Sequence, residues 1–196
     1  MFLLAQVAAK ELHALGVVVI PGPAVHSPEE VAEWFCSASH SLPGAPNRKK
    51  HQVASHGVAK RLGSRIAAAM ERAGVLEDRE VAKDALGLYG IRTEAGAQRQ
   101  NLMHCDWEQR GLGIARRPDS SVPCSSIWAA CASFSLFGAD GRRVKVCAGE
   151  MAVFRGDWFH EGGPHESPWL RVHAFSRPKG ARVLPWPDSV FSYYEM

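Results

Sequence analysis

The spacing of hydrophobic and polar positions predicts helices near the start of the chain. Residues 3–15 carry apolar side chains at helical intervals and stop before Gly16. The β-branched run 17–20, closed by Pro-Gly-Pro, predicts a buried strand. Ser27 is followed by a proline and two acidic residues, which predicts the N-cap of a helix running to about Ser39.

The next segments continue this mainly helical pattern. Residues 41–56 are rich in proline, glycine and positive charge and predict a loop. A further helix is expected over about 58–73, ending near Gly74. We therefore expect the first 85 residues to be mostly helical.

The pattern changes at about residue 86, where short β-rich segments separated by turn signals begin. Asp140-Gly141 is one such signal and is typical of a hairpin. Many short strands with even turn spacing predict a sandwich or a barrel. The expected strands cover residues 86–92, 98–106, 125–137 (one long apolar segment), 142–147, 150–155 and 169–176.

Composition narrows the class of protein. A chain of 196 residues is expected to form one domain with a sizeable core, and its formal charge of +3 is no signature of nucleic-acid binding. Its five cysteines are odd in number and lack CxxC spacing, which argues against a disulfide framework and predicts a reducing, cytoplasmic location. No run reaches the roughly 18–20 apolar residues of a membrane span. The apolar start lacks a basic region, so we expect a helix there rather than a signal peptide.

Two segments offer metal ligands. His104 and Asp106 are two positions apart, so a strand would place both side chains on one face, with Cys105 facing away. His160 follows the predicted strand 150–155, whose end would line the mouth of a barrel. Two histidines and one carboxylate form the facial triad of non-haem Fe(II) oxygenases. The pattern therefore predicts a metal site.

Arg171 lies on the strand that follows His160, which can run antiparallel beside 150–155. Because a guanidinium pairs with a carboxylate through two parallel bonds, Arg171 could hold the far carboxylate of an acid cosubstrate. Arg177 is the alternative. We prefer Arg171, since Arg177 and Pro178 lie at the expected exit of the strand, where proline ends ladder pairing.

Residues 86–178 resemble the 2-oxoglutarate- and Fe(II)-dependent dioxygenases, in the broad pattern of the phytanoyl-CoA and prolyl hydroxylases and the AlkB-like proteins. The most specific stretch, 149–163, is similar to the family segment G-[DE]-x-x-x-F-x-G-D-x-x-H-x-G. Residues 170–175 are similar to the family's cosubstrate-binding strand, and 12–22 give a weaker, family-like opening.

The resemblance implies an α+β fold, with a double-stranded β-helix (jelly roll) core and N-terminal helices packed on one side. A single oxygenase domain would span 1–196, with 1–85 as the mostly helical support, 86–178 as the core and 179–196 as a C-terminal tail.

The resemblance also implies a cofactor set. Fe(II) would be held by His104, Asp106 and His160, which would thereby be the catalytic residues, and the C5 carboxylate of 2-oxoglutarate would pair with Arg171, with ascorbate as a possible activator. Further cosubstrate contacts are expected from residues on strands where such enzymes often place them, namely Tyr89, Asn101 and Arg92.

The expected activity is hydroxylation or oxidative demethylation of a prime substrate, with release of succinate and CO2. One alternative is a jelly-roll module that keeps a metal without turnover, although an intact triad with Arg171 argues against it. Another is an oxygenase acting on nucleic acid, but basic pairs are usually solvated faces. Those pairs are Arg48-Lys49-Lys50, Lys60-Arg61, Arg116-Arg117 and Arg142-Arg143.

Several residues near the expected site have ordinary structural interpretations. His173 should share the face of Arg171, either as a core residue or as a support for the site. Trp107, Trp158 and Trp169 flank the site, and core packing is their default role. The sequence leaves the prime substrate and the oligomeric state open, because substrate choice lies in variable loops.

Overall fold

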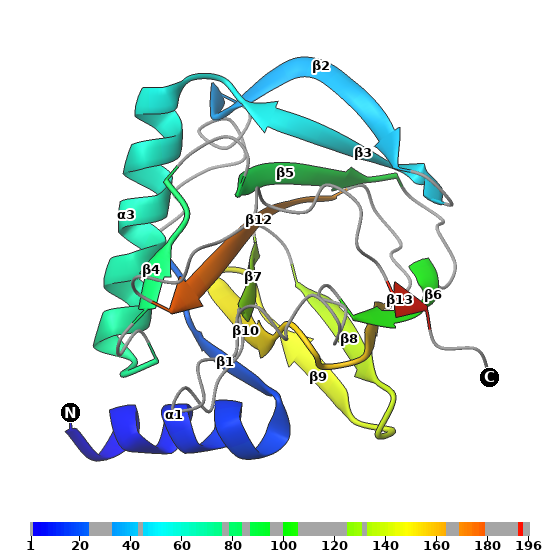
Figure 1. The fold of residues 1–196 in the computed structure, drawn as a ribbon. Helices are drawn as coiled ribbons and strands as arrows, with labels where there is room; N and C mark the ends of the chain where they lie inside the picture. The colour runs from blue at the N-terminus through cyan, green and yellow to red at the C-terminus, as the bar shows by residue number, and fades with distance from the viewer. Residues whose placement is uncertain are drawn as a thin grey trace.

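In the residues that it describes, the computed structural model comprises two facing β-sheets and two flanking helices (Figure 1). The helices are α1 (Phe2–Leu15) and α3 (His56–Arg72). The strands are β1 (Val17–Pro21), β2 (Phe35–Leu42), β3 (Ala45–Val53), β4 (Arg79–Val81), β5 (Leu88–Thr93), β6 (Gln100–Cys105), β7 (Ser125–Ala130), β8 (Phe134–Gly138), β9 (Arg143–Val146), β10 (Glu150–Arg155), β11 (His160–Gly162), β12 (Trp169–Pro178) and β13 (Ser192–Tyr193). The structure describes residues 2–23, 33–42, 45–75, 79–83, 87–94, 100–105, 125–130, 133–163, 169–178 and 192–193.

Within these residues, the larger sheet has eight strands in the order β1-β10-β7-β12-β5-β3-β2, with β4 paired to β12. The smaller sheet has the order β13-β6-β11-β8-β9. Neighbouring strands in both sheets are antiparallel. Two such sheets closed on one another form the double-stranded β-helix, so the predicted fold class is confirmed.

The larger sheet has an outer face beneath α3 and an inner face toward the smaller sheet. Because side chains alternate along a strand, neighbouring residues of β12 point to opposite faces of the sheet. Val172 and Ala174 pack in the outer cluster with the apolar side of α3, which leaves Arg171 and His173 on the inner face. A second cluster, which includes Phe154 from β10 and residues from β8 and β9, fills the space between the sheets.

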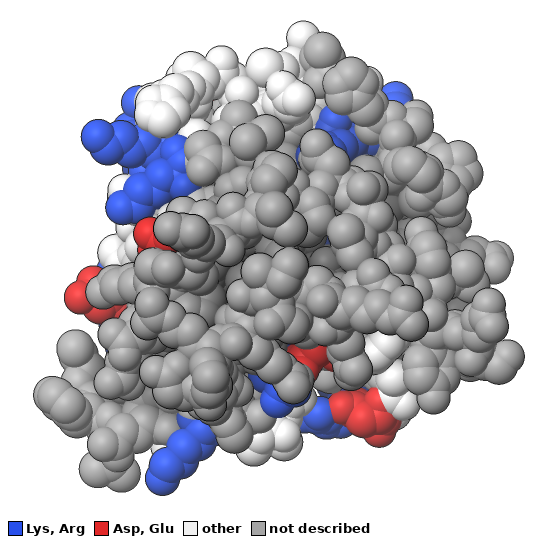
Figure 2. All heavy atoms as spheres, in the orientation of Figure 1, with Lys and Arg blue, Asp and Glu red and all other residues white. Residues whose placement is uncertain are grey.

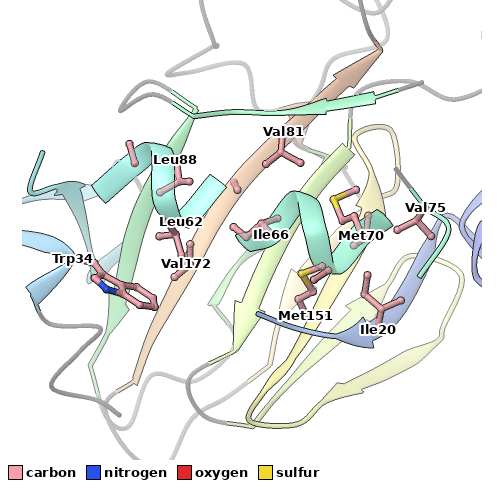
Figure 3. Packing of buried hydrophobic residues seen from close by; sticks show 14 of the residues in the cluster. Ile20, Trp34, Leu62, Ile66, Met70, Val75, Val81, Leu88, Met151 and Val172 are labelled. Atoms are coloured by element: carbon pink, nitrogen blue, oxygen red, sulfur yellow. The ribbon is translucent and has the colours of Figure 1, made fainter. Parts of the chain in front are cut away.

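Helix α3 forms because its apolar residues recur on one side, and Figure 3 shows Leu62, Ile66 and Met70 packed against the strands of the larger sheet. Ser55 caps the N-terminus, accepting a hydrogen bond from the Val58 amide at 3.3 Å. Gly63 lets α3 approach the backbone just after β4 closely, because a Cβ atom at this position would lie 2.3 Å from the Ala82 carbonyl oxygen. Helix α1 packs beside β1, which is the edge strand of the larger sheet at the end opposite to β2 (Figure 1).

The prediction that residues 1–85 are mostly helical is wrong. Strand β2 replaces the described end of the helix predicted over 27–39, and β3 replaces the loop predicted over 41–56. The start of that helix, 24–32, lies outside the described residues. Both strands extend the larger sheet beyond β5. Their conformation is therefore set by pairing with strands distant in sequence, which outweighs the preference of the local composition.

Three further expectations need correction. The apolar segment 125–137 forms two strands, β7 and β8, which belong to different sheets. β12 does not lie beside β10, because β7 separates them. β12 also continues through Pro178, which is opposite Arg79 in the short strand β4, so the ladder does not end at Ser176. The helices predicted over 3–15 and 58–73 are confirmed, as are the strands at 17–20 and 150–155.

No helix in the described ranges is long and apolar enough to cross a membrane.

Candidate metal and cosubstrate site

The two histidines predicted as metal ligands are brought together by the smaller sheet. His104 in β6 and His160 in β11 are direct cross-strand partners, and their ring centres lie 4.7 Å apart. Both are buried, with 3% and 0% of their surface exposed. Imidazoles that bind one metal side by side, each at about 2.1 Å, have centres roughly 4–5 Å apart. This spacing fits a shared metal ion.

The hydrogen bond at His160 fixes its tautomer. Nδ1 lies 3.0 Å from the carbonyl oxygen of Trp158, and a carbonyl can only accept, so Nδ1 carries the proton. In the neutral ring this leaves Nε2 with the lone pair that a metal needs. Orientation of a ligating histidine through its other nitrogen is usual in metal sites. The ring therefore has the form of a metal ligand.

Aromatic side chains surround His160. The Trp158 ring is nearly parallel to it, with 8° between the planes and 5.6 Å between the centres. Phe154 approaches from β10 of the larger sheet, with its ring centre 4.4 Å away. His160 therefore lies between the two sheets, in an apolar setting that excludes water.

Asp106, the third predicted ligand, lies outside the described residues. Among the residues that are described, no group of three histidine, cysteine, aspartate or glutamate side chains could hold a metal ion. The described residues thus include two of the three predicted ligands, and a 2-His-1-carboxylate triad would need a carboxylate in addition.

The predicted cosubstrate residue Arg171 lies on the inner face of the larger sheet. It is 1% exposed and is among the largest fully buried side chains. Ile91 of β5 and Ala130 of β7 are its cross-strand partners. A buried guanidinium is well suited to a carboxylate, because desolvation strengthens charge-assisted bonds.

Tyr89 belongs to the same inner face. It is opposite His173, and the two ring centres lie 4.8 Å apart. Phe175 continues the group, 4.8 Å from His173. Thr93 adds a fully buried hydroxyl at the far end of β5. The inner wall is thus polar at Arg171 and Thr93 and aromatic between Tyr89 and Phe175.

Lys50 is a residue of this wall that the sequence did not single out by itself. Lys50 lies in β3, where it is the cross-strand partner of Ile91 in β5, and its Nζ lies 4.2 Å from the centre of the Tyr89 ring. Lys49 and Lys50 therefore lie on opposite faces of β3, since Lys49 is exposed and opposite Arg92. Only the strand alternation of β3 could have revealed this, and that strand was predicted as a loop.

Arg92, another predicted cosubstrate contact, is not brought to the inner face. Arg92 lies on the opposite side of β5, with its side chain 52% exposed and 3.5 Å from Glu94. Asn101 lies in β6, and Arg177 is opposite Glu80 at the end of β12, but their side chains lie outside the description.

The remaining basic pairs do not form one surface within the described residues. Figure 2 shows Lys and Arg side chains gathered over the upper part of α3, where Lys60 and Arg61 are exposed on the outer side of the larger sheet. Arg61 also lines a cavity of about 240 Å³ beside Trp34. Arg142 is bound to Asp140 instead. Arg116-Arg117 lies outside the description.

Two ion pairs flank the segment before His160. The hydrogen bond from Arg142 holds the pKa of Asp140 below its usual value, with burial opposing the shift. The bond to Asp157 raises the pKa of Arg155, whose Nη2 lies 2.8 Å from Oδ2 of that carboxylate. Each carboxylate is thus bound to an arginine two residues away and stabilises the backbone near His160.

The fold matches solved structures over nearly its whole length. HygX from Streptomyces hygroscopicus, with nickel and 2-oxoglutarate bound, is 12% identical with a TM-score of 0.64, covering 95% of this chain and 97% of that one. The epimerase SnoN, in complex with Fe3+, alpha ketoglutarate and nogalamycin RO, is 14% identical with a TM-score of 0.60, covering 89% and 83%. A prolyl hydroxylase in complex with a hypoxia inducible factor peptide fragment, from Trichoplax adhaerens, is 13% identical with a TM-score of 0.58, covering 91% of each chain.

These likenesses define the fold as the double-stranded β-helix of the 2-oxoglutarate- and Fe(II)-dependent oxygenases. No protein-family model matches the sequence, and no curated protein matches it.

Proposed function

We propose that this chain is a 2-oxoglutarate- and Fe(II)-dependent oxygenase that oxidises a C–H bond of a prime substrate and releases succinate and CO2. The observation that carries the proposal is the buried pair His104 and His160, with the fully buried Arg171 on the inner wall of the other sheet. These residues would supply two of the three metal ligands and the cation that a dicarboxylate would need.

Each residue has a distinct role in this proposal. His104 and His160 would hold Fe(II), and Asp106 would complete the triad through its spacing from His104. Arg171 would bind the C5 carboxylate of 2-oxoglutarate and so fix the cosubstrate along the inner wall. Fe(II), when bound, supplies the O2 chemistry that couples decarboxylation of 2-oxoglutarate to substrate oxidation.

The surroundings serve this chemistry by excluding water. His160, Arg171 and His173 are each at most 3% exposed, and Phe154 and Trp158 cover the His160 ring. A dry cavity strengthens the charge-assisted contacts of the cosubstrate and protects a reactive centre from side reactions. Tyr89 supports the same wall through its contacts with His173 and Lys50.

The prime substrate is a separate question from the fold. The matched structures carry hygromycin B, nogalamycin RO and a peptide fragment, and SnoN is an epimerase. Because one fold supports these different uses, we assign this chain the cosubstrate chemistry and leave its prime substrate to experiment.

The test is an anaerobic titration of the full chain with Fe(II), with and without 2-oxoglutarate. We expect a visible charge-transfer absorption only when both are present. Succinate release is then screened across amino acids, peptides, nucleobases, single-stranded DNA and RNA, and lipids. Fe(II) binding without this absorption would instead identify a metal-binding module, and no Fe(II) binding at all would refute the site.

A further inference from the structure

We infer that Trp158 is the positioning residue of His160, holding the imidazole in the plane and tautomer that a metal ligand requires. The inference rests on the proposed function, which assigns His160 to the metal. Two parts of Trp158 act on the same ring. Its indole is stacked on the imidazole at 8°, and its carbonyl oxygen accepts the Nδ1–H bond at 3.0 Å.

Gly138 creates the space for this indole. It is the cross-strand partner of His160 in β8, on the side opposite His104. A Cβ atom at Gly138 would lie 2.6 Å from Oδ1 of Asp140 and 2.8 Å from Cζ2 of Trp158, so any side chain there would displace both the carboxylate and the ring. The inner side of the smaller sheet thus carries His104, His160 and the Trp158 indole in sequence across its strands.

A second glycine adjoins the same edge of the indole, beside Cδ1. A Cβ atom at Gly16 would lie 2.9 Å from Cδ1 of Trp158, and Gly16 has a φ of 78°, which favours glycine. The ring is also only 8% exposed and packs with Phe154, 5.8 Å between centres. The indole is thus buried against Phe154 and stacked on the imidazole, in a space that a side chain at either glycine would reduce.

A polar contact lies on this same edge, at Nε1, between the atoms that adjoin the two glycines. Trp158 Nε1 lies 3.4 Å from Oδ2 of Asp140, in the turn between β8 and β9. Arg142 binds the same carboxylate through Nε at 2.9 Å and also donates to the Leu15 carbonyl at the end of α1. The end of α1 and the β8–β9 turn are therefore connected to the metal ligand through one indole.

The backbone around Trp158 is held in the same way. The Trp158 amide donates to the Arg155 carbonyl at 3.0 Å, and the Ala139 amide donates to the Phe159 carbonyl at 3.1 Å. These bonds fix the carbonyl that orients His160. Contacts that orient a ligating histidine typically contribute 10–100-fold to metal affinity, and we expect Trp158 to contribute within that range.

The experiment measures Ni(II) affinity by titration calorimetry, with the folded fraction of each variant taken from its thermal unfolding curve. Trp158→Leu removes the stack and should raise the Ni(II) Kd about ten-fold or more. Trp158→Phe keeps a stacked ring and should restore most of the affinity. Gly138→Ala removes no functional group but displaces the indole, and should weaken Ni(II) binding as Trp158→Leu does.

Trp34→Leu is the matched control, because Trp34 is also 8% exposed but lies in the outer cluster away from His160. It should lower the unfolding temperature and leave the Ni(II) Kd unchanged. Wild-type affinity in folded Trp158→Leu and Gly138→Ala, or an equal loss in Trp34→Leu, would overturn the inference. Failure of the wild-type chain to bind Ni(II) would overturn the proposed function instead.

Discussion

His104 and His160 are direct cross-strand partners in β6 and β11, and their ring centres lie 4.7 Å apart. Replacing either by alanine should abolish specific metal binding, because one imidazole with one carboxylate is a poor site. At a Ni(II) concentration of 100 times Kd, the wild-type chain should gain about 2.7 kcal/mol in unfolding free energy. Thermal unfolding with and without Ni(II) measures this gain, which should vanish in His160→Ala.

His51→Ala is the control for that experiment. His51 lies in β3, where its Nδ1 is 3.0 Å from the Cys36 carbonyl oxygen, away from the paired histidines. Its variant should keep the full Ni(II)-dependent stabilisation. If His51→Ala and His160→Ala lose it equally, the metal is binding elsewhere.

Arg171 is expected to set the affinity for 2-oxoglutarate without affecting the metal. Arg171→Met removes two charge-assisted bonds, each typically contributing about 1.5–3 kcal/mol, so the Kd of 2-oxoglutarate should rise about 100-fold or more. Titration of the Fe(II)-loaded protein under anaerobic conditions measures it.

Arg92→Met is the matched control, because that arginine is on β5 with an exposed side chain. Its 2-oxoglutarate Kd should stay within two-fold of the wild type, as a rough bound for a screened surface charge. A large loss in Arg177→Met with none in Arg171→Met would transfer the cosubstrate role to Arg177.

Lys50 and Tyr89 should be energetically coupled, because the ammonium lies over the aromatic face at 4.2 Å. A double-mutant cycle of Lys50→Met and Tyr89→Leu should give a coupling of about 0.5–1 kcal/mol in urea unfolding. Lys49→Met with Tyr89→Leu should give none, since Lys49 is exposed on the other face of β3. Equal couplings would show that the effect is not specific to this contact.

Gly63 should reverse the usual effect of a glycine-to-alanine change in a helix. Alanine normally stabilises a helix interior by about 1 kcal/mol, but its Cβ here would lie 2.3 Å from the Ala82 carbonyl oxygen. Gly63→Ala should therefore lower the unfolding free energy by about 1–3 kcal/mol. Gly57→Ala, in the first turn of the same helix, meets nothing closer than 3.7 Å and should be neutral or stabilising.

Asp140 should make the free energy of unfolding depend on pH at the acidic end of the range. Because the bond from Arg142 lowers its pKa in the folded state from the ordinary 3.8, its contribution is complete above that pH and is lost as the pH falls through the lowered value. The difference in urea midpoint between wild type and Asp140→Asn should be constant from neutral pH to about pH 5 and shrink near pH 3. The carboxylate is 37% exposed, so the difference should be small. A difference that grows at low pH would contradict this assignment.

Periodicity predicted the elements whose apolar residues face one side. The stripe of Leu62, Ile66 and Met70 in α3 and the β-branched run of β1 both depend on burial that the sequence displays directly. The strand β3 is not predicted because most of its residues are polar. The alternation of apolar and polar positions that indicates a strand is therefore absent from the run Arg48-Lys49-Lys50. Its conformation follows from pairing with β5, which local sequence does not encode.

The candidate site was predictable to the extent that it lies in short motifs. His160 and Arg171 were identified from their neighbours in sequence, and both are buried in the structure. The roles of Gly138 and Lys50 depend on which strands lie side by side, and no local pattern carries that information. Trp158 was assigned to core packing; the structure confirms its burial and adds its contact with His160.

The pairing of β1 with β10, in which Val17 is opposite Phe154, has a consequence for synthesis of the protein. As the chain leaves the ribosome, the first strand must wait for nearly the whole domain to emerge before its partner exists. Until then its Val-Val-Val-Ile run is an apolar segment open to association with other chains. The loss of residues beyond β9 would leave it in that condition permanently, so a prematurely ended chain should aggregate rather than fold in part.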